Sequence, residues 1–421
     1  MMSKLAESDT NPQELRRIRE KRVTDAIRLK IPDRMPVCTA IGYFAAKYAG
    51  IPCSAAYYDF DAWYAAYKKT LTDFQADMIF QQPFTPGKVL EILNPKARRW
   101  PGYNADSRFG HQAVEIDNMQ ADEYDAFISD PSDYLFRTIL SRTSENMSGF
   151  TGFPKLSDLE SGAIALHRMA EAFSNPEIVR SIEILLEAGR ELNKWKEKRM
   201  KFDQMILDLG FPTLFHTAAM PPFDVISNGM RGLTGTVTDM YRQPDRLIAA
   251  CDKILELTLA RPLPPPNENG NIRVFMTNTR GSDEFLSKEQ FDRFYWPTFK
   301  KLVNNLVERG GTPCIFFEGN FTSRLEYLLE FPRGKVLVRF DSTDIFRAKD
   351  VLKGHLCIEG NVPSSLLQMG TTDDVKEHCK KLIDYCGKDG GYILSPRSST
   401  DEVKPENLKT MIEFTKEYGV Y

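Results

Sequence analysis

Short runs of apolar residues alternate with amphipathic stretches through the second half of this 421-residue chain. The runs lack regular polar alternation, which is typical of strands buried on both faces of a parallel sheet. The stretches between them repeat apolar residues at helical spacing, which favours helices packed on that sheet. The pattern predicts strands at 272–278, 313–319, 335–341, 355–360 and 391–396, and helices at 286–310, 322–330, 343–353 and 371–387.

The first half carries the same kinds of element at wider spacing. It contains strand-like runs at 35–40, 76–82 and 212–219, interrupted by long helical stretches at 132–148 and 176–206. About eight strands alternating with helices predict an α/β fold, a (β/α)8 TIM-type barrel with an elaborated helical N-terminal half. We expect one domain over residues 1–421, in which 1–34 form a helical extension whose basic, amphipathic pattern indicates a solvated helix.

Composition limits the classes of partner. Hydrophobic residues make up 42% and charged residues 27% of the chain, and the net charge is -3, so no electrostatic reason exists to expect nucleic acid or an anionic membrane. No apolar window reaches the ~20 residues of a membrane span, and no signal peptide is evident. The seven cysteines form no CxxC pair. We therefore expect reduced thiols and a cytoplasmic location.

Two of the predicted strands end on the same tripeptide. Glu318-Gly319-Asn320 follows "CIFF", and Glu359-Gly360-Asn361 follows "HLCI"; Asp341 ends the strand between them. In a barrel the carboxyl ends of strands gather at one mouth, so these acids should face a common pocket. A carboxylate after an apolar run is costly unless it is paired, metal-bound or functional. We therefore predict Glu318, Asp341 and Glu359 as catalytic residues, with the glycines and asparagines shaping the turns.

Other polar residues lie at predicted strand ends. Tyr43 and His216 follow early strands, and Asn278 and Arg280 end the run "VFMTNTRG". An arginine there could bind an anionic substrate such as a carboxylated aromatic compound, and the alternative is a salt bridge to Asp283 or Glu284. We predict Tyr43, His216, Asn278 and Arg280 as substrate-binding residues.

Several segments resemble the uroporphyrinogen decarboxylase superfamily. "HLCIEGNVPSSLLQMGTTDDVKEHCKKLID" is similar to its GN-x-x-P segment, and "GGYILSP…VKPENLKTMIEF" to its closing strand and helix. "FLSKEQFDRFYWPTFKKLVNNLVERGGTPCIFFEGN" looks like the segment that precedes H-x-C-G-N in the methyltransferase branch, and "RGLTGTVTDMYRQPDRL" and "KIPDRMPV" fit as well. The resemblance spans nearly the whole chain and implies a barrel with a pocket at its mouth.

The resemblance also distinguishes two branches. True decarboxylases carry an arginine-bearing segment where this chain has "IGYFAAKYAGI" (41–51), and F-S-D where it has Phe80-Gln81-Gln82. A neutral Gln82 in a substrate-binding position holds pyrroles less firmly than an aspartate does. The chain therefore resembles more closely the cobamide-dependent methyltransferases, which bind zinc through H-x-C and a later cysteine. Here those positions fall on Phe316, Glu318 and the cysteine-free segment 395–398.

The metal is therefore expected to have atypical ligands. His355, Cys357 and Glu359 alternate along one strand and share a face, so zinc held by Glu318, Cys357 and His355 is the ligand set we predict. The alternatives are a cysteine buried as a small hydrophobe and a histidine hydrogen-bonded at the strand's start.

Three functions remain open. The first is a corrinoid-dependent methyltransferase that moves a methyl group between a small substrate, such as an aromatic O-methyl compound, and a separate corrinoid protein. The second is a decarboxylase of uroporphyrinogen or of a smaller carboxylated substrate. The third is a non-catalytic protein that binds a tetrapyrrole or corrinoid. The partners expected are a methyl donor or acceptor and a corrinoid protein, without nucleic acid or membrane, and a homodimer is left open.

Overall fold

Parallel strands form the centre of the molecule. The computed structural model describes residues 10–80, 86–159 and 161–421. Six strands pair in the order β10-β9-β8-β7-β6-β5, β1 pairs with β2, and all of these pairs are parallel. The strands are β1 (Cys38–Ala40), β2 (Met78–Phe80), β5 (Thr217–Ala218), β6 (Arg273–Asn278), β7 (Thr312–Phe317), β8 (Leu337–Phe340), β9 (Cys357–Glu359) and β10 (Tyr392–Ile393).

The two groups of strands are joined beside β1. A parallel bridge links Val37 to Leu394, next to β10, so eight strands follow one another in a continuous order. Within the described residues no backbone pairing joins β2 to β5; instead the rings of Phe80 and Phe215 lie 5.5 Å apart. Each predicted strand run contains one of these strands, so the predicted α/β fold with a parallel sheet is confirmed.

The strands have an outer and an inner face. Val274, Met276, Ile315 and Val338 on the outer face belong to the main hydrophobic core with the surrounding helices. The inner face carries a smaller apolar cluster, which we call the inner core. Its strand residues are Cys38, Met78, Cys314, Leu337, Cys357 and Ile393, and Val23, Ala26 and Ile27 of α1 (Pro12–Ile27) join them.

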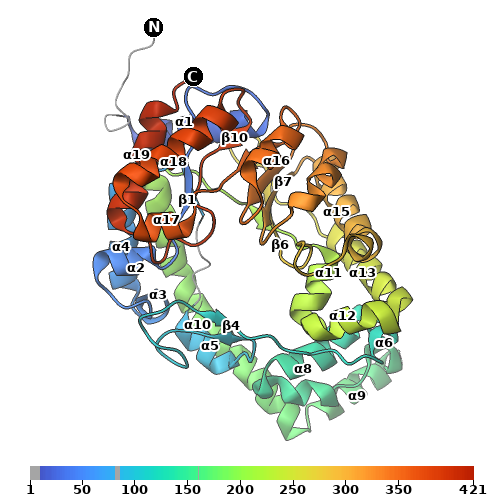
Figure 1. Cartoon of the computed structure of the whole chain (residues 1–421). Helices are drawn as coiled ribbons and strands as arrows, with labels where there is room; N and C mark the ends of the chain where they lie inside the picture. The colour runs from blue at the N-terminus through green and yellow to red at the C-terminus, as the bar shows by residue number, and fades with distance from the viewer. Residues whose placement is uncertain (1–9, 81–85, 160) are drawn as a thin grey trace.

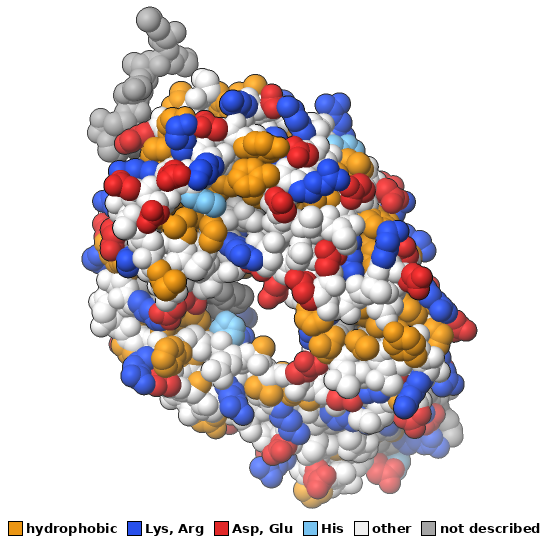
Figure 2. Space-filling view, in the orientation of Figure 1, with side chains coloured by type: hydrophobic (Ala, Val, Ile, Leu, Met, Phe, Trp, Pro, Cys, Tyr) orange, Lys and Arg blue, Asp and Glu red, His pale blue; other side chains and the backbone are white. Residues whose placement is uncertain are grey.

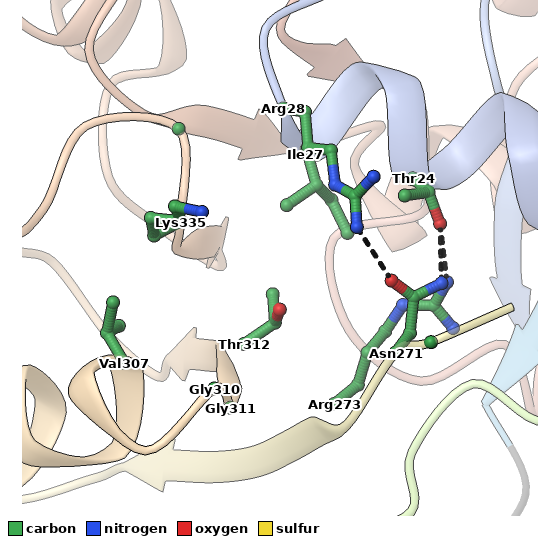
Figure 3. A pocket seen from close by; sticks show the side chains of 12 residues that line it. Thr24, Ile27, Arg28, Asn271, Arg273, Val307, Gly310, Gly311, Thr312 and Lys335 are labelled. Atoms are coloured by element: carbon green, nitrogen blue, oxygen red, sulfur yellow. Dashed lines mark hydrogen bonds between the residues drawn. The ribbon is translucent and has the colours of Figure 1, made fainter. Parts of the chain in front are cut away.

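Helix α1 covers the amino-terminal ends of the strands, and the prediction that it is solvated is wrong. Glu20 and Arg22 are buried in ion pairs with Arg273 and Asp77. Beside Arg273 a partly open cavity of about 90 Å³ lies between α1 and the starts of β6 and β7 (Figure 3). This cavity is at the opposite end of the strands from the predicted site.

Helices surround the sheet and build the rest of the molecule (Figure 1). Around the strands lie α13 (Pro244–Leu259), α15 (Trp296–Glu308), α16 (Ile345–Leu352), α18 (Thr372–Leu382) and α19 (Pro405–Tyr418), and the 3-10 helix η7 (Thr322–Glu330) replaces the helix predicted at 322–330. The N-terminal half contributes α4 (Phe60–Asp73), α5 (Gly87–Leu93), α9 (Ala163–Ala172), α10 (Pro176–Asp208) and α12 (Gly232–Arg242).

Two features of the N-terminal half differ from prediction. The helix predicted at 132–148 is divided into α7 (Pro131–Asp133), the π-helix η2 (Tyr134–Ile139), α8 (Leu140–Thr143) and the 3-10 helix η3 (Glu145–Gly152). A short antiparallel pair, β3 (Arg98–Arg99) and β4 (Gln112–Ala113), was not predicted. No helix in the described ranges is long and apolar enough to cross a membrane.

Candidate active site

The two Glu-Gly-Asn segments form turns after β7 and β9. Gly319 and Gly360 have φ of +94° and +136°, a region that favours glycine. Asn320 accepts hydrogen bonds from the amide and hydroxyl of Thr322, and the Asn361 amide donates to the carbonyl oxygens of Asp341 and Thr343, each at 3.1 Å. The asparagines therefore hold the turns, as the sequence indicated.

Strand register places the two glutamates at different depths. Phe316 of β7 pairs with Arg339 of β8, and Arg339 pairs with Glu359 of β9. Glu359 is therefore level with Phe316, and Glu318 is two residues nearer the carboxyl end. Glu318 is exposed, whereas Glu359 is buried. The same tripeptide thus supplies one accessible acid and one buried acid.

Glu318 has the most available carboxylate of the predicted site. Among the described residues its side chain makes neither a hydrogen bond nor an ion pair, and its backbone amide donates to the Asn278 carbonyl at 3.0 Å. Desolvation by nearby protein and the charge of Asp341 raise the pKa of Glu318, and Arg280 partly opposes this. An accessible carboxylic acid with a raised pKa keeps its proton to higher pH than an ordinary glutamate and can act as a proton donor.

Asp341 lies beside Glu318 and is already paired. One of its oxygens accepts from Arg397 Nε at 3.0 Å, and the other accepts from the Gly319 amide at 3.3 Å and from the Ser342 hydroxyl at 3.0 Å. Asp341 therefore links the turn after β7 to the segment after β10 and contributes charge next to Glu318.

Arg280 projects from the end of β6 toward the helical half. Its Nε donates to the Asn228 side chain at 2.7 Å, and Nη2 lies 3.8 Å from Glu115. The alternative partners considered from sequence are engaged elsewhere: Asp283 pairs with Arg324, and Glu284 accepts from the Asn320 amide. Arg280 thus lies close enough to Glu318 for its charge to act on that carboxyl, and its substrate-binding role stays a prediction.

Asp224 positions this arginine and was missed by sequence reasoning. It ends α11 (Pro222–Asp224), is fully buried, and accepts from the Arg280 amide at 2.9 Å, from Thr279, and from the Tyr295 hydroxyl at 2.6 Å. Burial raises its pKa to about 6 despite these donors. The only sequence signal is a lone acid in "PPFDVIS", without an apolar run before it.

Below Glu318, the buried Glu359 is paired with the half-buried Arg339. Arg339 Nε lies 3.7 Å from Glu359, Nη2 donates to the Pro396 carbonyl at 3.1 Å, and the guanidinium lies over the Phe316 ring. Burial raises the pKa of the Glu359 carboxyl, while Arg339 and the Ser395 hydroxyl oppose that rise. Glu359 is therefore held inside the strands and is not at the rim where the sequence placed it.

The predicted zinc ligands do not come together. Cys357 lies in the inner core, where burial raises its thiol pKa well above the ordinary value. His355 precedes β9, at the opposite end from Glu318, and its Nε2 is 2.9 Å from the Phe331 carbonyl. In the described ranges no three His, Cys, Asp or Glu residues are grouped to hold a metal. The residues therefore do not fit the expected zinc site, because strand alternation fixed the face but not the depth.

The remaining substrate-binding candidates have different surroundings. Tyr43 follows β1 as expected, but its hydroxyl is 2.7 Å from Tyr57 and 2.9 Å from His111 Nδ1. His216 precedes β5 and accepts at Nδ1 from the Arg273 amide, so it lies near the amino ends of the strands. Asn278 is fully buried on the outer face. Gln82 lies outside the described residues.

His111 was not predicted and belongs to the Tyr43 group. Burial and the charge of Arg98 lower its pKa to about 4, so the imidazole is neutral near pH 7. The sequence offered no signal, because His111 lies in a loop beside the unpredicted β4.

Inner-face side chains beside and above the inner core are only half-buried: Phe80, Phe215, Phe275, Thr277, Phe316 and Arg339. They keep accessible surface on the inner face of the strands, and we call the space that they line the hollow. Three of these rings pack on one another at 4.7 to 5.5 Å. Figure 2 shows a face of the molecule hollowed near its centre, with acidic and hydrophobic side chains around the opening. The site thus combines aromatic surface with charged groups.

Comparison with known proteins supports the resemblance. Residues 215–418 match the uroporphyrinogen decarboxylase (URO-D) family. The methylcobamide:CoM methyltransferase MtbA of Methanosarcina acetivorans is 28% identical over 152 residues, covering 36% of this chain and 43% of that protein. A uroporphyrinogen decarboxylase of Syntrophotalea carbinolica is 25% identical over 175 residues, covering 41% of this chain and 49% of that protein. The chain thus spans less than half the length of these curated relatives.

A solved structure extends the likeness of fold to nearly the whole chain. A methyltransferase from Methanosarcina mazei superposes with a TM-score of 0.59 at 15% identity, covering 95% of this chain and 98% of that one. At this identity the likeness concerns the fold alone.

Proposed function

We propose that this chain, whose residues 215–418 carry a uroporphyrinogen decarboxylase family domain, is a corrinoid-dependent methyltransferase. It would move a methyl group between a small substrate, such as an aromatic O-methyl compound, and a separate corrinoid protein. Its eight parallel strands would act as a closed barrel, with the reaction at their carboxyl ends.

The observation that carries this proposal is the Glu318 carboxyl. It is accessible, has no bonding partner among the described residues, and has a raised pKa beside Asp341 and Arg280. A relative that is a methylcobamide:CoM methyltransferase by name supports the reaction class. Because the described residues offer no ligand set for zinc, we assign proton transfer to Glu318 instead.

In the demethylating direction the carbon–oxygen bond of the donor would break, and the corrinoid of the partner protein would take up the methyl group. A corrinoid carried by the partner protein supplies the nucleophile for this transfer. The departing oxygen gains the electron pair of the broken bond and needs a proton, which protonated Glu318 donates. Asp341 favours the protonated form of Glu318 before transfer, and Arg280 stabilises the carboxylate that remains.

Methyl transfer to cob(I)alamin, used in place of the partner-bound corrinoid, tests the proposal. We expect loss of the cob(I)alamin absorbance together with release of the demethylated product, across a panel of methoxybenzoates. E318Q should lower the rate by about 10²–10⁴-fold, the usual contribution of a general acid. E326Q, at an exposed glutamate paired with Arg347, is the matched control. Wild-type activity in E318Q would refute the assigned role.

A decarboxylase of a small carboxylated substrate is the second candidate. It is favoured by three arginines, Arg280, Arg339 and Arg397, close to the predicted acids, and by the decarboxylase relatives. Release of carbon dioxide in the absence of any corrinoid would favour this reaction over methyl transfer.

A further inference from the structure

Of the three arginines near the site, Arg339 alone has a buried nitrogen without a hydrogen-bond partner among the described residues. Arg397 pairs with Asp341 at 3.0 Å, and Arg280 donates to Asn228 at 2.7 Å. A guanidinium has five N–H donors. Among the described residues, Arg339 makes one hydrogen bond, from Nη2 to the Pro396 carbonyl, and its buried Nε has no hydrogen-bond partner.

The acid nearest to Arg339 does not satisfy it. Glu359 Oε1 is 3.7 Å from Nε, beyond hydrogen-bonding distance, although Glu359 is itself buried. The raised pKa of Glu359 agrees with incomplete pairing, because a full charge-assisted contact would favour its ionised form. A half-buried cation with a buried, unused donor has a strong preference for an anion that can accept from it.

The surroundings of Arg339 select the rest of the ligand. Its guanidinium lies over Phe316 at 5.2 Å, on the inner face. Phe215 and Phe275, with ring centroids 4.7 Å apart, are half-buried on that face. Apolar rings that keep exposed surface on the same inner face as a cation fit a flat ring with one charged substituent.

We propose that the hollow binds a flat, ring-bearing carboxylate, with Arg339 binding the carboxylate and the phenylalanines contacting the ring. This inference rests on the proposed function, since it names the substrate class of the same site. A carboxylate matches the planar fork of the guanidinium and can accept two of its N–H groups together. The carboxylate end would lie at the depth of Arg339, which leaves the far end of the ring toward Glu318, two residues nearer the rim on β7.

Calorimetric binding of benzoate to the whole chain tests the inference, with benzamide as the neutral probe of the same shape. We expect benzoate to bind at least about tenfold more tightly than benzamide, because a charge-assisted hydrogen bond is lost in the amide. Cyclohexanecarboxylate should also bind more weakly than benzoate. The R339M variant should erase the preference for benzoate, whereas R347M, which changes an exposed arginine on α16, should keep it.

If R339M does not fold, the double variant R339M/E359Q is measured in its place, because it removes the charges of Arg339 and Glu359 together. A folded variant that still prefers benzoate, or a wild-type protein without that preference, would overturn the inference. The binding measurement contains no corrinoid, so its result does not depend on whether the chain transfers methyl groups. Methyl transfer without benzoate preference overturns the carboxylate site alone, and Arg339-dependent benzoate binding without methyl transfer overturns the proposed reaction alone.

Discussion

Replacing Asp224 by asparagine should change how the stability of the protein depends on pH. The carboxyl is fully buried, and its pKa is raised from 3.8 to about 6. In the native state it therefore keeps its proton at pH values where the unfolded chain has lost it. The stabilisation is fully present below the unfolded pKa and is lost as pH rises through the native pKa.

The size of the effect follows from the two pKa values. A shift from 3.8 to about 6 corresponds to roughly 3 kcal/mol of unfolding free energy, most of it lost between about pH 4 and pH 6. D224N has no charge to titrate, so its stability lacks this contribution. The difference between wild type and D224N should therefore change by about 2–3 kcal/mol, with the wild type relatively less stable at the higher pH.

Urea unfolding of both proteins at a series of pH values measures this difference. The Tyr295 hydroxyl donates to Asp224 at 2.6 Å and thereby lowers its pKa, so Y295F should move the change to higher pH. A difference between wild type and D224N that stays constant from about pH 4 to pH 7.5 would refute the assigned burial cost.

Three further outcomes are expected. The rate of methyl transfer should fall as pH rises through the raised pKa of Glu318. The pH–rate profile of E318Q should not show this fall, and a profile that still shows it would assign the fall to another group. D77N should destabilise the protein by roughly 3–5 kcal/mol in urea unfolding near pH 7, because it removes the fully buried carboxylate that pairs with both Arg22 and Arg34. A loss under about 1 kcal/mol would contradict this. G319A should lower the free energy of unfolding by about 1–3 kcal/mol, because φ is +94° and an added Cβ would lie 3.0 Å from the Cβ of Ser282. The control G189A in α10 places its Cβ in open space and should not destabilise the protein.

The strands could be predicted because their signal is local. An apolar run such as 335–341 contains the buried strand β8 wherever its neighbours lie in the chain. Partners are a long-range property and could not be read in the same way. The charges of α1 therefore indicated a solvated helix, although Arg22 reaches Asp77, which lies beside β2. The same limit hid Asp224, whose importance depends on contacts with the end of β6.

Depth along a strand was the second quantity that the sequence did not contain. Alternation correctly placed Cys357 and Glu359 on one face, yet Cys357 lies in the inner core and Glu359 one level above it. The predicted metal set combined residues from three depths, so its members could share a face without meeting. The turn after β7 was easier to predict, because a glycine at positive φ and Asn320, which accepts from Thr322 two residues away, depend only on neighbouring residues.

The two Glu-Gly-Asn turns show how register can divide one motif into two roles. Had β7 and β9 ended level, Glu318 and Glu359 would face each other as equivalent acids, and their mutual repulsion would oppose ionisation of both. Because Phe316 is level with Glu359, the second acid instead lies beside Arg339, beneath the hollow. Along the strand direction, the offset separates the accessible proton donor Glu318 from the deeper ion pair of Arg339 and Glu359. A ring-bearing substrate can then be held at one end and react at the other, which neither motif alone would allow.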